Sequence, residues 1–133
     1  MGGTSKEDTS GESSGLGVTV TLENDVQGSF TVTPGFTDVS TSAGDYGSAT
    51  PTVLDFSGTA AESHQFTVPA TDDAVLESTE TFTVDLISSN TFVDDSDTAV
   101  GTITDNDNAA VTIEDVSAVE GTGLVFTVTL DND

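Results

Sequence analysis

Four carboxylates lie close together in the segment TDDAVLESTETF, residues 71–82. They are Asp72, Asp73, Glu77 and Glu80, and no Lys or Arg stands among them. Like charges at this spacing raise one another's electrostatic energy unless a cation neutralises them. Carboxylate oxygens are also the ligands that hard divalent cations prefer. This segment is therefore the first candidate for a metal-binding loop.

Four further acidic residues have the same character. Asp45 lies in the turn AGDY, Asp105 and Asp107 lie in the turn TDND, and Glu12 precedes the first alternating segment of the chain. Each can add oxygens to a shared site if the fold brings the turns together. A single acidic turn is equally well explained as a solvated loop, so convergence of the turns decides between the two interpretations.

The elements that must position these turns are β-strands. Apolar residues alternate with polar ones, mainly Thr, and clusters of Gly, Asp, Asn and Ser separate the alternating segments. This period of two is typical of half-buried strands, and strands at this spacing predict an antiparallel sandwich or barrel. We find no amphipathic helical segment. The predicted strands are 17–22, 28–33, 52–57, 64–69, 80–87, 99–105, 109–115 and 124–130.

The order of the strands predicts that the acidic turns converge. Turns at one end of an antiparallel sandwich are separated by an even number of strands, because each strand reverses the direction of the chain. Two predicted strands lie between Asp45 and Asp72, and two lie between Glu80 and Asp105. The same reasoning adds the turn of Glu12. The carboxylates expected together are Glu12, Asp45, Asp72, Asp73, Glu77, Glu80, Asp105 and Asp107.

Calcium is the cation that fits such an end best. It takes six to eight oxygens at roughly 2.3–2.6 Å in a flexible shell, which carboxylates and carbonyls of loops supply well. Magnesium requires a tighter octahedron, and zinc prefers His or Cys, whereas the chain has one His and no Cys. The segment DNDNAAVTIEDV is no EF-hand loop, because it lacks Gly at the sixth position and strands flank it.

The composition narrows the classes of partner and activity. Twenty-four acidic residues face a single Lys or Arg, which gives a formal net charge of -23. Phosphate recognition requires clustered Lys and Arg, so we expect no nucleic-acid partner, and an anionic membrane surface is disfavoured for the same reason. No apolar run approaches the about 20 residues that span a membrane. His64 has no nucleophile or orienting partner in the local sequence, so we expect no enzyme activity.

The chain contains an internal repeat. Residues 15–25, GLGVTVTLEND, match residues 123–133, GLVFTVTLDND, and the match extends back to Glu12 and Glu120. The matching positions are 108 residues apart. A tandem repeat is typical of a long multi-domain protein. The expected organisation is a flexible N-terminal segment at 1–11, one full repeat at 12–107, and the opening strands of a second repeat, or a donated strand, at 108–133.

Three motifs together resemble the Calx-beta domain family. They are the Asp-Tyr turn in AGDY, the acidic turn and strand start in FTVPATDDAVLESTETFTVDL, and the closing GTITDND. The Glu-x-x-Gly pattern of ESSG and EGTG also resembles this family. The resemblance covers about residues 12–107, with a fragment at 109–133. It implies a seven-stranded immunoglobulin-like antiparallel β-sandwich that binds several calcium ions at one end.

The resemblance also extends the expected ligand set beyond carboxylates. It implies a ligand role for the carbonyl of Val75, and Asn106 offers an amide oxygen where a third Asp is common. Ala74 stands where the family often has Asp, so one calcium site is expected to be weak or absent. The calcium ligands that the matching motifs imply are Glu12, Asp45, Asp72, Asp73, Val75, Glu77, Glu80, Asp105, Asn106 and Asp107.

The chain departs from the family at its start. The family has an apolar first strand upstream of Glu12, where TSKEDTSG shows no strand pattern, and a suitable strand occurs instead at 109–119 as AAVTIEDVSAV. In a tandem array this strand opens the next repeat. In an isolated chain it can complete the edge of a neighbouring molecule, a head-to-tail contact that propagates into filaments. The alternative is a frayed C-terminal tail.

The expected function is a calcium-binding structural repeat module of an extracellular or cell-surface bacterial adhesion or matrix protein, stiffened by Ca²⁺ at one end of the sandwich. Its expected partners are calcium ions and neighbouring repeats of the same protein, without insertion into a membrane. Two alternatives stay open: a filament subunit that polymerises by strand donation from 109–130, and a calcium-sensing regulatory domain. The Thr-, Gly- and Asp-rich composition with almost no Lys favours the bacterial surface over the sensor.

Overall fold

The computed structural model describes residues 2–6 and 15–132. Among these residues, no helix is long and apolar enough to cross a membrane. The described residues form strands joined by turns and loops. The strands are β1 (Gly2–Lys6), β2 (Gly15–Thr21), β3 (Phe30–Asp38), β4 (Leu54–Phe56), β5 (Ser63–Pro69), β6 (Glu80–Ser88), β7 (Ala99–Ile103), β8 (Ala109–Ile113) and β9 (Val128–Asn132).

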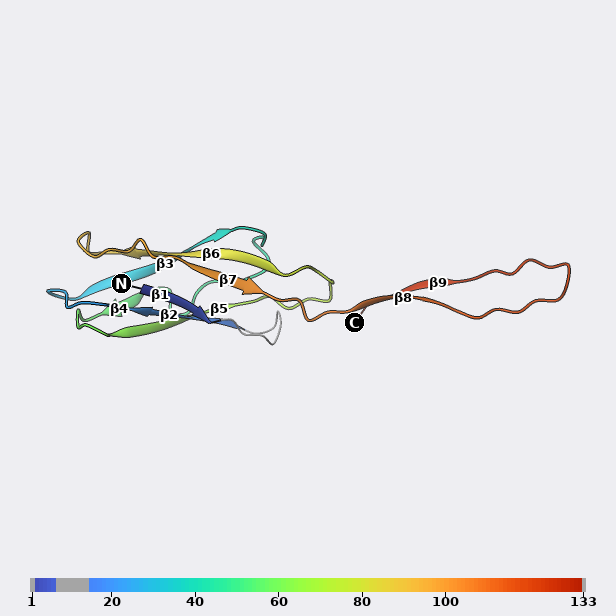
Figure 1. The fold of residues 1–133 in the computed structure, drawn as a ribbon, viewed down its shortest axis with the longest axis horizontal. Helices are drawn as coiled ribbons and strands as arrows, with labels where there is room; N and C mark the ends of the chain where they lie inside the picture. The colour runs from blue at the N-terminus through green and yellow to red at the C-terminus, as the bar shows by residue number, and fades with distance from the viewer. Residues whose placement is uncertain (1, 7–14, 133) are drawn as a thin grey trace.

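Two antiparallel sheets face each other and form a β-sandwich-like body (Figure 1). One sheet has the strand order β1-β2-β5 and the other has the order β4-β3-β6-β7. Every ladder between neighbouring strands is antiparallel. The hairpin β8–β9 forms a separate sheet that projects from one end of the body. The predicted all-β antiparallel fold is therefore confirmed.

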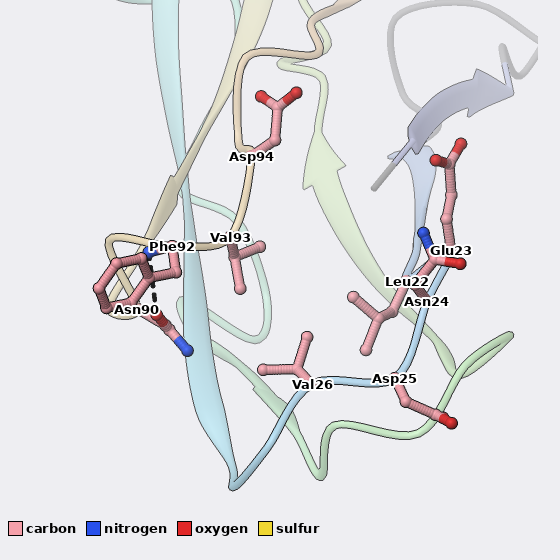
Figure 2. A pocket seen from close by; sticks show the side chains of 9 residues that line it. All are labelled: Leu22, Glu23, Asn24, Asp25, Val26, Asn90, Phe92, Val93 and Asp94. Atoms are coloured by element: carbon pink, nitrogen blue, oxygen red, sulfur yellow. Dashed lines mark hydrogen bonds between the residues drawn. The ribbon is translucent and has the colours of Figure 1, made fainter.

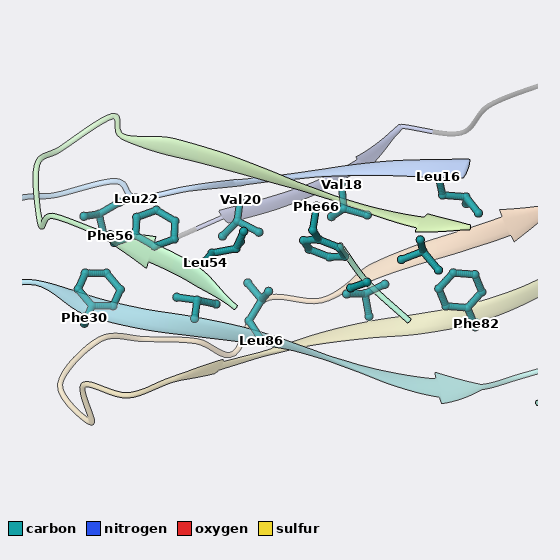
Figure 3. Close-up of a cluster of buried hydrophobic side chains, with 14 of the residues drawn as sticks. Leu16, Val18, Val20, Leu22, Phe30, Leu54, Phe56, Phe66, Phe82 and Leu86 are labelled. Carbon is teal, nitrogen blue, oxygen red and sulfur yellow. The ribbon is translucent and has the colours of Figure 1, made fainter. Parts of the chain in front are cut away.

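The core of the body follows from the alternation in the sequence. Along β2, Leu16, Val18 and Val20 are buried, while the residues between them are half-exposed. Phe66 on β5 and Phe82 on β6 are also buried, and Figure 3 shows these side chains meeting between the two sheets. Full burial of such a side chain is worth roughly 1.5–3 kcal/mol relative to exposure. This apolar layer holds the two sheets together and thereby positions their turns.

An aromatic group closes the core at the end from which the hairpin projects. The ring of Tyr46 stacks on Phe82 with the centroids 4.3 Å apart, and the ring of Phe36 lies 6.0 Å from each of them. Gly101 on β7 lies opposite Phe82 in the ladder, and a Cβ at Gly101 would come within 2.3 Å of the Phe82 ring. The ring of Phe82 therefore occupies the space that a side chain at this position would need.

The strand bounds differ most from the prediction in β3 and β9. β3 continues to Asp38, beyond the predicted end at 33, because its ladder with β6 runs as far as Phe82. β9 begins at Val128 rather than at 124, because its partner β8 ends at Ile113. Both differences reflect the pairing partner, which the local pattern of the sequence does not specify.

β1 is a strand that the sequence pattern does not predict. Residues 1–11 are expected to be a flexible segment, whereas Gly2–Lys6 pairs with β2 over its whole length. Backbone hydrogen bonds need no apolar side chain, so an open strand edge can pair with a segment that lacks a strand pattern. The consequence is that the edge of β2 is covered by the sequence GGTSK.

Gly101→Ala is expected to destabilise the body by about 1–3 kcal/mol, the usual cost of overpacking a filled core. The added Cβ must displace the ring of Phe82. Gly17→Ala on β2 is the matched control, because a Cβ at Gly17 meets nothing within 4 Å. Urea unfolding followed by circular dichroism measures both variants. Equal stability of the two variants would contradict the packing of Phe82 over Gly101.

Candidate metal centre

The strand ends beside Tyr46 carry the acidic turns. β5 ends at Pro69, and Ala70 forms a bridge with Tyr46, so the turn after β5 lies beside the turn that contains Asp45. Glu80 at the start of β6 pairs with Ile103 at the end of β7, so the turn after β7 lies there too. The three acidic turns predicted from strand order therefore lie at one end of the body, which we call the acidic end.

The turn that carries Asp45 is held by hydrogen bonds. The backbone N–H and the hydroxyl of Ser42 both donate to Asp45 Oδ2, the hydroxyl at 3.0 Å. The backbone N–H of Thr71 donates to the carbonyl of Asp45 at 2.9 Å, which ties this turn to the middle acidic turn. The Asp45 carboxylate therefore has a defined position at the acidic end.

Asp45, Glu77 and Glu80 form a cluster that we call the acidic triad. Each contributes a carboxylate oxygen, and these oxygens all lie within 4.8 Å of one another. All three residues are half-buried. Oxygens bound to one Ca²⁺ at roughly 2.3–2.6 Å lie no more than about 5 Å apart, so this spacing is compatible with a shared ion.

Asp105 connects the acidic triad to a second group of carboxylates. Asp105 accepts hydrogen bonds from the backbone N–H of Glu77 and, at 2.9 Å, from the backbone N–H of Asp107. Asp72 and Asp73 lie close enough to Asp107 for their charges to raise its pKa. The acidic end therefore brings together Asp45, Asp72, Asp73, Glu77, Glu80, Asp105 and Asp107.

The pKa values within the acidic triad are shifted in opposite directions. The pKa of Asp45 is lowered, chiefly by the hydrogen bond from the backbone of Ser42. The pKa of Glu80 is raised, first by burial and then by its hydrogen bond with Asp45 and by the charges of Asp45 and Glu77. In the absence of a cation, Glu80 therefore holds its proton more firmly than usual beside an ionised Asp45. A bound cation would favour the ionised form of both carboxyls.

Asp107 has an unsatisfied oxygen. Burial, followed by the charge of Asp105, raises the pKa of Asp107. Asp107 Oδ2 is buried and has no hydrogen-bond partner among the residues that the structure describes. Leaving a buried acceptor without a partner is unfavourable, and more so for a charged group. An oxygen in this condition, within a group of carboxylates, fits a hard cation as its missing partner.

Three other candidate ligands stay predictions. Glu12 lies outside the described residues. Val75 is exposed on the middle acidic turn, and its backbone N–H donates to Asp73 Oδ1 at 2.9 Å. Asn106 is exposed, and its backbone forms a hydrogen bond with Asp105 that helps to lower the pKa of Asp105. The last two residues therefore support the acidic end through their backbone.

Asp38 belongs to the acidic end although no motif indicates it. Asp38 Oδ1 accepts hydrogen bonds from the Tyr46 hydroxyl at 2.7 Å and from Thr41 Oγ1 at 3.0 Å. Burial and then the bond to Asp38 raise the pKa of Tyr46 to about 12. Asp38 is the last residue of β3, so the count of strands would have indicated it if β3 had been predicted at its full length.

A hollow of about 490 Å³ lies at the opposite end of the body, between the turns that follow β2 and β6 (Figure 2). We call it the distal hollow. Asp25 Oδ1 in this hollow accepts a hydrogen bond from the backbone N–H of Ala60, in the loop between β4 and β5, at 2.8 Å. Hydrogen bonds from Ser96 lower the pKa of Asp94 in the same hollow. These contacts account for Asp25 and Asp94 of the distal hollow without a ligand.

Comparison of the chain with protein-family models, with curated proteins and with solved structures gives no match. The resemblance of its motifs to the Calx-beta domain therefore stays an expectation from the sequence. The acidic end itself is the basis for the function proposed below.

Glu80→Gln is expected to raise the melting temperature at neutral pH in the presence of EDTA. Because the pKa of Glu80 is raised in the folded protein, stability falls as the pH rises from the ordinary value of 4.5 through the folded-state pKa. A neutral amide avoids this loss and can still donate to Asp45. The advantage of the variant should disappear below the ordinary pKa of 4.5, where the carboxyl is protonated in both states.

Glu62→Gln is the control with the opposite expected sign. Bonds with His64 and with the backbone of Ser57 lower the pKa of Glu62 to about 2. This carboxylate therefore stabilises the fold above its ordinary pKa of 4.5, and the effect is lost as the pH falls toward 2. At neutral pH, Glu62→Gln should lower the melting temperature. Thermal unfolding across this pH range measures both variants, and shifts of the same sign at neutral pH would refute the account.

Proposed function

We propose that this chain is a calcium-binding structural module that Ca²⁺ stiffens at its acidic end. The proposal rests on one observation. Carboxylates from three turns that are far apart in the sequence lie together at one end of the two-sheet body. A single Lys or Arg in the whole chain leaves these charges almost without a cationic side chain to balance them. A divalent cation relieves such a concentration of charge.

The chemistry of the donors supports calcium. The side chains gathered at the acidic end offer carboxylate oxygens, which suit a hard cation, rather than the nitrogen or sulfur that zinc prefers. The spacing within the acidic triad is compatible with one shared ion. Asp107, with its unpartnered Oδ2, is a candidate ligand for a second ion together with Asp72 and Asp73.

Calcium would act by neutralising the repulsion between the carboxylates and by linking the turns that carry them. Without the ion, the raised pKa values of Glu80 and Asp107 reflect the cost of placing these carboxyls in partly buried, negatively charged surroundings. An ion that binds the folded state in preference to the unfolded chain stabilises the fold by mass action. The turn that contains Asp105 leads directly into β8, so the same ion would also stiffen the joint between the body and the hairpin.

The wider setting of the proposal is a tandem array outside the cell. The two sheets of the body hold three and four strands, in line with the seven-stranded immunoglobulin-like sandwich that the Calx-beta resemblance implies. The repeat at an offset of 108 residues and the acidic, Thr-rich composition support a bacterial extracellular or cell-surface adhesion or matrix protein. A calcium-sensing domain is the alternative, and affinity separates the two: sensors bind at roughly 10⁻⁷–10⁻⁵ M and extracellular modules at roughly 10⁻⁴–10⁻³ M.

Calcium at about 10 mM is expected to raise the free energy of unfolding by about 1.4–2.7 kcal/mol per site, for a Kd of roughly 0.1–1 mM. For a domain of this size the melting temperature should rise on the order of 10 °C. Calorimetry with CaCl₂, and again after addition of EDTA, measures the effect. Magnesium should produce a smaller rise, because it demands a tighter octahedron and retains its waters. Equal rises for both cations would indicate charge screening and contradict the proposal.

Glu77→Gln combined with Glu80→Gln tests where the ion binds. This double variant should be more stable than the wild type in EDTA, because it removes repulsion, and should lose most of the calcium-dependent rise in melting temperature. Asp55→Asn combined with Asp85→Asn removes the same charge from β4 and β6 outside the acidic end. This control should keep the rise, and an equal loss in both double variants would exclude the acidic triad as the site.

A further inference from the structure

The edge of β2 is covered by a strand that offers little to the core. β1 pairs with β2 so that Gly3 lies opposite Val20 and Ser5 lies opposite Val18. Val18 and Val20 are both buried. Directly opposite residues of an antiparallel pair lie on the same face of the sheet. The edge positions that lie opposite these two core residues are therefore a glycine and a serine.

A small apolar gap lies between the two sheets near this edge. It is lined by Val18 and Val20 of β2, Val84 and Leu86 of β6, Ala99 of β7, and Asp97 and Thr98 just before β7. β1 pairs with β2 and contacts β7, so the backbone of the edge strand lies beside two of the strands that line this gap. A strand with apolar side chains at this edge can pack them against the apolar layer between the sheets.

The hairpin contains the apolar counterpart of β1. The repeat offset of 108 residues aligns Val111 with Gly3 and Ile113 with Ser5. β8 pairs with β9 antiparallel, just as β1 pairs with β2. The strand that carries two branched apolar side chains therefore lies on the hairpin, and its glycine- and serine-containing counterpart lies on the body.

The hairpin exposes the face that the body buries. Leu130 and Val128 on β9 are 69% and 61% exposed, whereas the equivalent Leu22 and Val20 are 3% and 0% exposed. Val111, which lies opposite Leu130, is 71% exposed. Burying such side chains is favourable, because it removes apolar surface from water. A two-stranded hairpin with an open apolar face is only marginally stable by itself, so this face favours a partner.

We propose that β8 of one copy of this chain replaces β1 at the edge of β2 in a second copy. Two registers are compatible with this pairing. In the first, the hairpin register, β8 pairs with β2 as it pairs with the equivalent residues of β9, which places Val111 opposite Leu22 and Ile113 opposite Val20. The register that β1 occupies places Val111 opposite Val20 and Ile113 opposite Val18. Both registers direct the two apolar side chains into the core, because a shift of two residues preserves the face of a strand.

The donor of the strand must be another molecule. β8 follows β7 after only residues 104–108, so it begins at the acidic end. To pair antiparallel with β2 of its own chain, β8 would have to begin at the opposite end of the body. The start of β8 would then lie between about 23 and 30 Å from Gly15, as measured along β2 at roughly 3.3 Å per residue. The linker from Ile103 spans at most about 20 Å. A second copy, placed head to tail, removes this restriction.

The contact has a defined consequence for assembly. Strand addition of this kind is heterologous, because each copy uses β8 as a donor and the edge of β2 as an acceptor, so it continues from copy to copy. The acidic end of the donor then lies beside the distal hollow of the acceptor. Each copy carries a formal charge of -23, so added cations favour the contact by screening. The apolar fit itself does not depend on the proposed calcium function.

Light scattering after size-exclusion chromatography tests the proposal with the full chain. We expect the mass to rise with protein concentration, both in CaCl₂ and in EDTA with about 0.5 M NaCl to screen the charges. Val111→Glu combined with Ile113→Glu should weaken association at least about tenfold, because it would place charges in an apolar core. Thr112→Glu combined with Thr127→Glu adds the same charge to the other face of the hairpin and should leave association unchanged.

Deletion of residues 2–6 changes association in the opposite direction. β1 competes with the incoming β8 for the same edge of β2. Without β1 the edge is open, so association should strengthen. An unchanged or weakened association after this deletion would contradict replacement of β1.

Disulfide trapping identifies the edge that is covered. The chain has no cysteine. One population carries Thr19→Cys on the acceptor edge and is mixed with a second population that carries a cysteine on the donor strand. In the hairpin register, Glu114→Cys should form the mixed disulfide with Thr19→Cys. In the β1 register, Thr112→Cys should form it instead. These positions lie away from the core face. Thr31→Cys on β3 is the control acceptor and should form no disulfide with either donor.

Three further results would overturn the proposal. The first is a chain that stays monomeric at every concentration, and the second is association that Val111→Glu with Ile113→Glu leaves intact. The third is a Glu114→Cys population that forms disulfides only with itself, which would mean that two hairpins cover each other. The rise in melting temperature with calcium, measured on the Val111 and Ile113 variant, tests the proposed function separately from the assembly.

Discussion

Repulsion between carboxylates that the apolar core forces together is the constraint on which this structure depends. Packing between the two sheets fixes the strand ends and brings three acidic turns to one place. Hydrogen bonds from the backbone of Ser42 to Asp45, and from the backbone of Glu77 to Asp105, then hold the carboxylates where they are. The hydrophobic effect thus maintains an arrangement of charge that the turns alone would not adopt, and a divalent cation is the partner that we propose for it.

The acidic end and the hairpin are connected by the chain itself. Residues 104–108 contribute Asp105 and Asp107 to the group of carboxylates and lead without interruption into β8. The direction in which the hairpin leaves the body is therefore set beside the candidate metal centre. An ion that orders this turn would also present β8 in one direction, which gives a physical route from cation binding to the arrangement of neighbouring repeats or copies.

Much of the fold follows from the alternation of polar and apolar residues, because each strand of the body has one face on the core. The pattern missed the second half of β3, where Pro34 and Gly35 interrupt it although both pair with β6. It also missed β1, since pairing at an edge needs only a backbone. The count of strands was sufficient to predict that the acidic turns lie together. It could not show which oxygens meet, because hydrogen bonds such as that from Ser42 to Asp45 depend on the geometry of each turn. Asp38 was missed for the same reason as the end of β3.

The chain contains one tyrosine and no tryptophan, and the tyrosine lies at the acidic end. Tyr46 stacks on Phe82 and donates its hydroxyl hydrogen to Asp38 at 2.7 Å. Its pKa of about 12 keeps the phenol protonated throughout the neutral range. Tyrosine emission from the folded protein therefore originates at a single known position, next to a carboxylate that can quench it. The molecule carries its own optical reporter for any rearrangement of the neighbouring turns, and no label has to be attached to read it.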